Sequence, residues 1–539
     1  MPQVDLTPLR ASLLTVFLWA ALYLPYLGTP EIRGEESRRI LPARTMIETG
    51  DWIVPRIGGE EYYSKPPLIN WSIGALFALT GMQNEWLARL PSVLWILAFA
   101  LTAALVLRPR LGPWPSVMVG LFFLTTVGML DKGRMAEIEP MYISQTGIAY
   151  FLWARFWSEG QGWKAYTIPW IFLGLGMLAK GPVHLFFFYL AVGSTLWIAR
   201  RRVELILPAH GVGVAILLSL FLPWTLANLQ QVEVAEETSA AWWGQLRTRF
   251  NYHSINWQDW VELPFRMVFN FFPWTILLIL LWRTPVRGDD QEGEGESMAG
   301  RWGMVIAGAK IALILGLICF SLSPGIRPRY SMPLFGMAAL VTADLWRRRE
   351  ITDALRKGVE TWWGRLNQWS LGALVGFALV AVIVVGVAIE ELSWWMGIPG
   401  VLAAGALWVT RKHWQAQPLL VQNALMIAAA QLVLYQFVGP WETARGLYRP
   451  VAREVKSLTP EEERPLVFLS PGHLRFLFYL KRSYKEVTAV KELPREDGYY
   501  LAIHEGRLGA MQTVLREIEA RELGRVDGGR WKLVFFAVE

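Results

Sequence analysis

The chain has 539 residues, of which 53 % are hydrophobic and only 18 % are charged, and its mean hydropathy is +0.31. A soluble domain is about a quarter charged, so this composition excludes a set of ordinary soluble domains, as well as disordered, coiled-coil and collagen-like chains. The net charge is +7, and most of the basic residues lie in short loops between apolar runs. In such loops basic residues set the orientation of a membrane protein, so they do not indicate nucleic-acid binding. The 29 Trp residues suit membrane–water boundaries, and one cysteine cannot close an intramolecular disulfide. The sequence therefore predicts an all-α polytopic membrane protein.

Thirteen apolar runs, give or take one, are candidates for crossing a hydrocarbon core about 30 Å thick. They lie at 11–28, 88–107, 114–130, 141–157, 167–179, 183–199, 205–226, 265–282, 303–322, 330–346, 370–389, 396–410 and 419–438. The first is interpreted as a retained helix rather than a signal peptide, because no small-residue cleavage site follows it and many spans do. The short apolar stretch 67–82 is interpreted as a helix lying at the interface.

Basic residues set the orientation. Clusters such as Arg200–Arg202 and Arg347–Arg349 fall on one side of the membrane if the N-terminus is cytoplasmic, which is the positive-inside pattern. An odd number of spans then places the tail outside the cytoplasm. We therefore expect a transmembrane domain over 1–439 and a small periplasmic α/β domain over 440–539, with strand-like runs such as YYLAIH and one helical pattern, GAMQTVLREIEARE.

The first outside loop, 29–66, carries an unusual mixture of charges. Glu35 and Glu36 follow the first apolar helix by a few residues, with Arg38 and Lys65 in the same loop. Such a mixture suits an anionic lipid headgroup and a polar reaction near the membrane surface. The alternative for any single charge is a solvated face of ion pairs.

A second acidic pair, Glu137 and Glu139, stands where the run 141–157 begins. Ionisable groups at membrane depth are costly and usually functional. The alternative is a short loop in which neighbouring basic residues neutralise both acids. Periodicity does not separate the two glutamates.

Three further segments place cations on the outside. Lys180 lies between two apolar runs, where a lysine can snorkel from a helix end or serve as a point charge for phosphate. Arg327 and Arg329 share a short loop and suit bidentate phosphate contacts. The loop 230–264 alternates aromatic and basic groups around His253, which favours an interfacial lid over a site for single-stranded nucleic acid.

The motifs in these segments resemble, in order, those of the GT-C glycosyltransferases, and above all the bacterial family that contains lipid A aminoarabinose transferase and the protein O-mannosyltransferases. They are EESR at 35–38, ARTM at 43–46, GDWIVP at 50–55, YYSKPPL at 62–68, LAKGP at 178–182, and FSLSPG at 320–325 followed by Tyr330 and Pro333. The resemblance covers residues 11 to about 345.

The resemblance implies a GT-C type bundle of about 13 transmembrane helices, with amphipathic helices in the first loop and a small periplasmic domain above it. It implies a glycosyltransferase of the bacterial inner membrane that moves a sugar from a polyprenyl-phosphate-linked donor, such as an undecaprenyl-phosphate sugar, to a lipid, glycan or protein acceptor, with inversion at C1. Membrane lipids are further partners, and nucleic acid is not expected. The catalytic residues implied are Glu35 and Glu139. The substrate-binding residues implied are Glu36, Arg38, Tyr62, Tyr63, Lys65, Glu137, Lys180, His253, Arg327, Arg329 and Tyr330.

The chain departs from the family in three places. Glu35 and Glu139 stand where the family usually has Asp, and Ser64 stands where an acid often precedes the loop lysine. The last change leaves the metal requirement open: no cofactor is certain, and a divalent metal ion is one option.

Two other classes of function fit the composition. A transporter or flippase for a lipid-linked saccharide would commonly show internal repeats and broken helices, and the sequence reveals neither. A scaffold protein could bind cell-wall material through its tail. Within the same superfamily, an oligosaccharide ligase or polymerase with a diphosphate donor is a further alternative.

Overall fold

The computed structural model describes residues 6–62, 64–231, 256–282, 297–323, 325–348, 446–469, 475–494, 498–529 and 531–539, with isolated positions between 361 and 430. The chain divides into two compact units. Unit 1 comprises Met1–Leu27, Ser64–Ile69 and Arg89–Val438, and unit 2 comprises Gly28–Tyr63, Asn70–Ala88 and Gly439–Glu539. The predicted spans 370–389, 396–410 and 419–438 lie outside the continuously described ranges.

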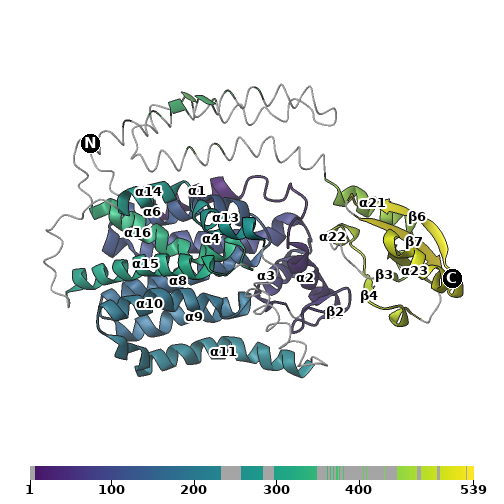
Figure 1. Ribbon diagram of the computed structural model, residues 1–539, viewed down its shortest axis with the longest axis horizontal. Helices are drawn as coiled ribbons and strands as arrows, with labels where there is room; N and C mark the ends of the chain where they lie inside the picture. Colours follow the sequence, from purple (N-terminus) through teal and green to yellow (C-terminus); the bar gives the residue numbers. More distant parts are fainter. Residues whose placement is uncertain are drawn as a thin grey trace. The chain divides into compact units, whose positions relative to one another are not determined.

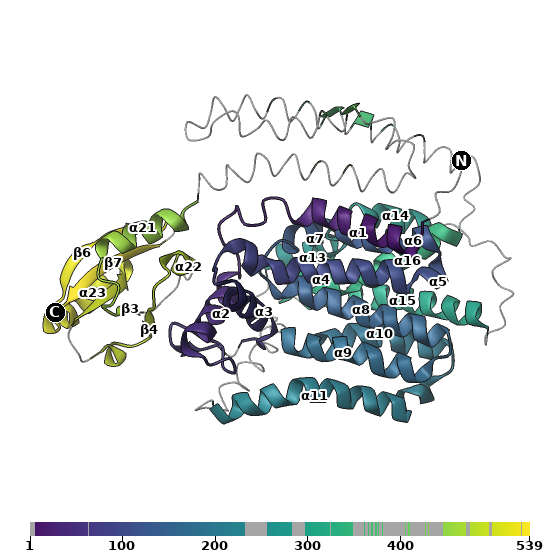
Figure 2. The same cartoon turned by 180° about the vertical axis from the view of Figure 1, so that it is seen from behind.

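Unit 1 is helical (Figures 1 and 2). Its helices are α1 (Pro8–Tyr23), α4 (Glu85–Val106, whose first turn belongs to unit 2), α5 (Arg108–Leu111), α6 (Pro113–Leu124), α7 (Val127–Lys132), α8 (Ile138–Ser158), α9 (Gly162–Lys180), α10 (Val183–Ile198), η1 (Arg202–Ile206), α11 (Pro208–Gln231), α13 (Trp257–Phe269), α14 (Trp274–Trp282), α15 (Met298–Ser321), η3 (Pro328–Leu334) and α16 (Phe335–Arg348).

Helix α8 lies at the centre of unit 1. It packs against α9, α10, α15 and α16, and nearly all its residues are buried, including the polar Ser144, Gln145 and Thr146. A helix can be buried on every face because its backbone hydrogen bonds are satisfied within it. The N-terminus of α8, which carries Glu137 and Glu139, is therefore enclosed by protein.

Two predicted spans are broken, contrary to expectation. The run 114–130 forms α6 and α7, and the run 265–282 is divided between α13 and α14. The unwound backbones satisfy each other, because the N–H groups of Val127 and Gly128 donate to the carbonyl oxygens of Phe272 and Asn270, both at 2.9 Å. Irregular backbone at membrane depth is tolerated when protein buries it in this way. The sequence reveals no broken helices, whereas the structure interrupts the helix at these two places.

The membrane character of unit 1 is clear from its longest helices. Among the described residues, α4, α11 and α15 are long and apolar enough to cross a membrane. Shorter apolar helices are α1, α3 (Leu68–Thr80), α6 and α10. Helix α3 occupies the stretch that was expected to be helical at 67–82.

The C-terminal part of unit 2 is a small α/β domain, as expected. Its strands are β3 (Leu466–Leu469), β4 (Lys485–Val487), β5 (Tyr499–His504), β6 (Arg521–Asp527) and β7 (Lys532–Val538), and its helices are α21 (Tyr448–Leu458), α22 (Leu477–Leu480), η5 (Val490–Glu492), η6 (Glu505–Arg507) and α23 (Leu508–Glu517). The sheet order is β4-β3-β5-β7-β6, in which β3 runs parallel to β4 and β5, and β7 runs antiparallel to β5 and β6.

The predicted helix GAMQTVLREIEARE is shorter than its pattern. Helix α23 ends at Glu517, Glu519 adopts a left-handed conformation with φ of 48°, and the chain continues into β6. Pairing of β6 with β7 overrides local helix propensity here.

The N-terminal part of unit 2 comprises α2 (Ser37–Thr49), the hairpin of β1 (Arg56–Ile57) and β2 (Glu60–Glu61), and most of α3. Asp51 organises the turn after α2, since its carboxylate accepts from the N–H groups of Ile53 and Val54 and from the Arg56 guanidinium. Burial opposes the effect of these hydrogen bonds, but together with the Arg56 charge they hold the pKa of Asp51 below its ordinary value.

Helices α10 and α15 approach closely at Gly308. A Cβ at this position would lie 2.1 Å from Thr195 Oγ1 and 2.8 Å from the Thr195 nitrogen, whereas a Cβ at Gly303 on the same helix would meet nothing within 4 Å. We expect Gly308→Ala to destabilise the protein by about 1–3 kcal/mol through overpacking. Its melting temperature in detergent should fall by several degrees, and that of Gly303→Ala should not fall. Equal melting temperatures for both variants would contradict the close approach.

Glu486 is a buried carboxyl group at the edge of the C-terminal sheet. Its backbone N–H donates to the Gly58 carbonyl at 2.7 Å, which joins β4 to the β1–β2 hairpin. Burial, and after it the charge of Glu60, raise the pKa of Glu486 from 4.5 to about 8. Between these two values the folded state holds a proton that the unfolded state has lost, so the stability that Glu486 supports falls as the pH rises through this window.

We expect Glu486→Gln, a neutral mimic of the protonated acid, to flatten this dependence. The melting temperature of the full-length variant should fall less than that of the wild type between about pH 5 and about pH 9. Glu517→Gln, an exposed site on α23, is the control and should retain the wild-type slope. A slope unchanged by Glu486→Gln would show that Glu486 does not titrate in this range.

Candidate active site

A small polar pocket of about 30 Å³ lies inside unit 1, where α8, α9, α10, α15 and η3 meet. Several predicted site residues line it together: Lys65, Glu139, Lys180, Arg329 and Tyr330. The remaining lining residues are Tyr142, Ile143, Val183, Phe187, Phe320 and Pro333. Charged groups from distant parts of the sequence are thus enclosed by aromatic and aliphatic walls.

The Glu139 carboxylate bridges two cations in this pocket. Its Oε1 lies 3.2 Å from Lys180 Nζ and 3.2 Å from Arg329 Nε, and Arg329 Nη1 lies 3.8 Å from Glu137 Oε2. Both glutamates are buried, and the side chains of Lys180 and Arg329 are only 13 % and 18 % exposed. Lys65 also lines the pocket, so three cationic side chains share its wall with the Glu139 carboxylate, and a wall of this kind favours an anionic group such as a phosphate.

Helix ends place these charges. Glu139 occupies the first turn of α8, where the helix dipole favours an anion, and Lys180 occupies the last turn of α9, where it favours a cation. Gly181, at φ of 92°, and Pro182 stop α9 directly after the lysine. Arg329 lies on η3, which begins at Pro328.

Aromatic rings hold the lysine. Lys180 Nζ lies 5.2 Å from the ring centroid of Tyr142 and 4.8 Å from that of Tyr330, which are cation–π distances. Tyr142 was not among the predicted site residues. The signal that could have identified it is its spacing, because it follows Glu139 by three residues on α8 and so shares its face.

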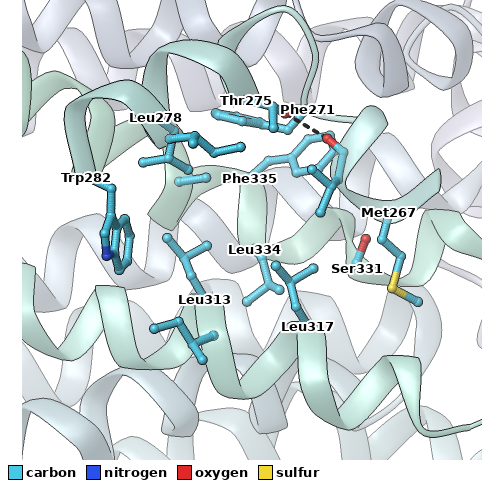
Figure 3. Close-up of a pocket in the computed structure, with 14 residues that line it drawn as sticks. Met267, Phe271, Thr275, Leu278, Trp282, Leu313, Leu317, Ser331, Leu334 and Phe335 are labelled. Atoms are coloured by element: carbon cyan, nitrogen blue, oxygen red, sulfur yellow. Dashed lines mark hydrogen bonds between the residues drawn. The ribbon is translucent and has the colours of Figure 1, made fainter. Parts of the chain in front are cut away.

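A larger apolar pocket of about 340 Å³ lies in unit 1 (Figure 3). It is lined by Met267, Val268, Phe271, Thr275, Leu278, Ile279, Trp282, Leu313, Ile314, Leu317, Ser331, Leu334, Phe335 and Ala338. The hydroxyl of Thr275 donates to the Val268 carbonyl at 2.7 Å, so it adds little polarity to the wall. Helix η3 lines both pockets, with Arg329 and Tyr330 at the polar one and Ser331 and Leu334 at the apolar one.

The first acidic pair lies in unit 2 just before α2, and its two members differ. Glu36 is fully buried and its Oε2 accepts the Arg33 N–H at 2.7 Å, which suits a structural role. Glu35 is 29 % exposed and pairs with Arg38 at 2.9 Å. Nearby, the Tyr62 hydroxyl accepts from the buried Arg39 at 3.0 Å, a partner that was not predicted. Of the pair, Glu35 is the accessible acid.

The other predicted residues have different outcomes. Arg327 is exposed and does not line the polar pocket. Tyr63 and His253 lie outside the described residues. Over the described ranges, no group of three or more His, Cys, Asp or Glu side chains is placed to hold a metal ion.

Comparisons with known proteins extend these observations. Residues 64–226 match the family model described as dolichyl-phosphate-mannose-protein mannosyltransferase. An undecaprenyl phosphate-alpha-4-amino-4-deoxy-L-arabinose arabinosyl transferase of Edwardsiella ictaluri is 26 % identical over 58 % of this chain and 55 % of its own length. An enzyme of the same name from Pseudomonas fluorescens is 29 % identical over 58 % of this chain and 54 % of its own length. The matched part of the chain thus spans little more than half the length of these relatives.

Among solved structures, ArnT from Cupriavidus metallidurans bound to undecaprenyl phosphate superimposes with a TM-score of 0.69. The match covers 98 % of this chain and 97 % of that one at 16 % sequence identity, so it establishes a shared fold. Together with the family match, it confirms the resemblance to the GT-C glycosyltransferases that the motifs predicted.

Proposed function

We propose that the protein is an integral membrane glycosyltransferase that transfers a sugar from a polyprenyl-phosphate-linked donor to a lipid, glycan or protein acceptor. In this proposal residues 1–439 form a transmembrane domain of about thirteen spans in the bacterial inner membrane. The site and the domain over 440–539 face the periplasm. The names of the relatives, which are arabinosyl transferases for undecaprenyl-phosphate-linked aminoarabinose, support the class of donor.

The observation that carries the proposal is the gathering of Lys65, Lys180 and Arg329 around one pocket. A lipid-linked sugar presents a phosphate whose negative charge grows as the C1–O bond breaks. Buried cations fixed by helix ends and aromatic rings stabilise that growing charge without having to reorganise. A lysine that only snorkelled from a helix end would not need a carboxylate and two rings around it.

The neighbouring apolar pocket supports a lipid as the carrier. Helix η3 presents Arg329 at the polar pocket and apolar residues at the other, so a phosphate and the first isoprene units could bind across one short element. Burial of isoprene surface contributes about 25 cal/mol per Å². A water-soluble nucleotide sugar would gain nothing from such a wall.

The roles of the two acids follow from their partners. Glu139 Oε1 lies between Lys180 and Arg329, so we assign Glu139 to holding these two cations in place. Glu35, which is accessible, is the base for a hydroxyl acceptor. Glu35 takes the hydroxyl proton, the oxygen attacks C1 from the face opposite the phosphate, and the C1–O electron pair leaves with the lipid phosphate. The configuration at C1 is inverted.

We expect Arg329→Ala to bind undecaprenyl phosphate at least about tenfold more weakly, because it loses a charged hydrogen bond worth about 1.5–3 kcal/mol. Lys180→Ala should weaken the binding of undecaprenyl phosphate by a similar factor. Arg327→Ala, two residues from Arg329 but exposed, is the matched control and should stay within about twofold of the wild type. The measurement is the shift in melting temperature that each purified variant shows on titration with the lipid in detergent. Equal shifts for Arg327→Ala and Arg329→Ala would contradict the assignment.

We expect Glu35→Gln to lower transfer to a hydroxyl acceptor by about a hundredfold or more while binding of the donor is retained. Glu517→Gln, an exposed site on α23 in the same unit, is the control. The assay follows lipid phosphate release and labelled product from an undecaprenyl-phosphate aminoarabinose donor in proteoliposomes. Turnover of Glu35→Gln near the wild-type value would refute its role. Movement of intact donor across the bilayer without cleavage by the wild type would instead favour a transporter.

A further inference from the structure

The loop that carries Glu35 is bound to the C-terminal domain within unit 2. The Glu31 carboxylate accepts from the backbone N–H groups of Tyr448 and Arg449, at 2.9 and 2.7 Å. These two N–H groups lie in the first turn of α21, where a helix dipole favours a negative charge. Both oxygens of Glu31 are thus engaged by the start of one helix.

The next residue is held by a tyrosine of the same domain. The N–H of Ile32 donates to the Tyr479 hydroxyl at 2.8 Å, and the Ile32 side chain is fully buried. Burial first, and then the negative charge of Glu85, raise the pKa of Tyr479, so this hydroxyl stays protonated at any physiological pH. Arg449 ion-pairs with Glu85, and its guanidinium lies 5.4 Å from the Tyr479 ring centroid.

The other end of the loop is fixed as well. Helix α2 begins at Ser37, and the buried Arg44 on it donates to the Leu477 carbonyl of the C-terminal domain at 3.4 Å. Only Arg33, Gly34, Glu35 and Glu36 lie between Ile32 and this helix. The position of Glu35 therefore depends on two anchors that both lead to the C-terminal domain.

We propose that the C-terminal domain positions the Glu35 loop, and that Tyr479 is a positioning residue for the transfer reaction, which it serves through its hydrogen bond to the Ile32 N–H. This inference rests on the proposed function, because it gives the domain a task only if Glu35 takes part in transfer. Tyr479 does not need to touch either substrate. Loss of its hydroxyl frees a buried N–H and lets the loop shift, and a shift of about 1 Å can cost a hundredfold in rate.

The test is Tyr479→Phe in the full-length protein, with Tyr500→Phe as the matched control. Tyr500 is a buried tyrosine on β5 in the same domain, and its ring packs near Arg464 and Arg482. We expect Tyr479→Phe to lower kcat on the order of tenfold, with KM for the donor within about twofold of the wild type. Hydrogen exchange of the peptide over 31–38 should be faster in Tyr479→Phe and unchanged in Tyr500→Phe.

The outcomes separate the two proposals. If the wild type releases no lipid phosphate from the donor, the proposed function fails. If the wild type is active and Tyr479→Phe matches it in kcat and in exchange of 31–38, the positioning role fails while the function stands. A fall in kcat that accompanies an equal fall in melting temperature in both tyrosine variants also overturns the positioning role, since it reports general destabilisation of the domain.

Discussion

The shared contact of Glu139 with Lys180 and Arg329 joins three elements that are far apart in the sequence: the start of α8, the end of α9 and the short helix η3. Buried charges are costly, and loss of one partner from such a group commonly costs about 3–5 kcal/mol. The three helix ends must therefore meet accurately, because a mismatch would leave a buried charge without its partner. Much of unit 1 serves this requirement, since α8 is enclosed by the helices that bring the other two ends to it.

Irregular backbone surrounds this polar pocket and its apolar neighbour. The breaks between α6 and α7 and between α13 and α14 exchange hydrogen bonds, and Phe271, beside one break, lines the apolar pocket. Helix η3 is a further departure from α-helical geometry. Broken helices are common in transporters, so they do not by themselves separate transport from transfer.

Much of this arrangement could be predicted from the sequence. The acids and bases stand at the borders of apolar runs, and a helix stop signal follows Lys180 directly, so the sequence predicts one site for Glu139, Lys180 and Arg329, and the structure brings the three to one pocket. The pairing of one carboxylate with two cations could not be predicted, because it depends on tertiary packing of helices separated by many residues. The same holds for Glu36 and Arg327. Glu36 is buried and Arg327 is exposed, although the sequence alone does not separate Glu36 from Glu35 or Arg327 from Arg329.

Glu35 lies in unit 2, in a loop that is bound to the small α/β domain of the same unit. Ordering the backbone of one residue costs about 1–2 kcal/mol, so the segment from Glu31 to Glu36 cannot hold one conformation by itself. Gly34, in the left-handed region at φ of 58°, adds freedom rather than rigidity. Hydrogen bonds from Glu31 to the start of α21 and from Ile32 to Tyr479 offset that cost. In the proposed reaction Glu35 must be held before the substrate arrives, and the contacts of its loop with the sheet domain would hold it there.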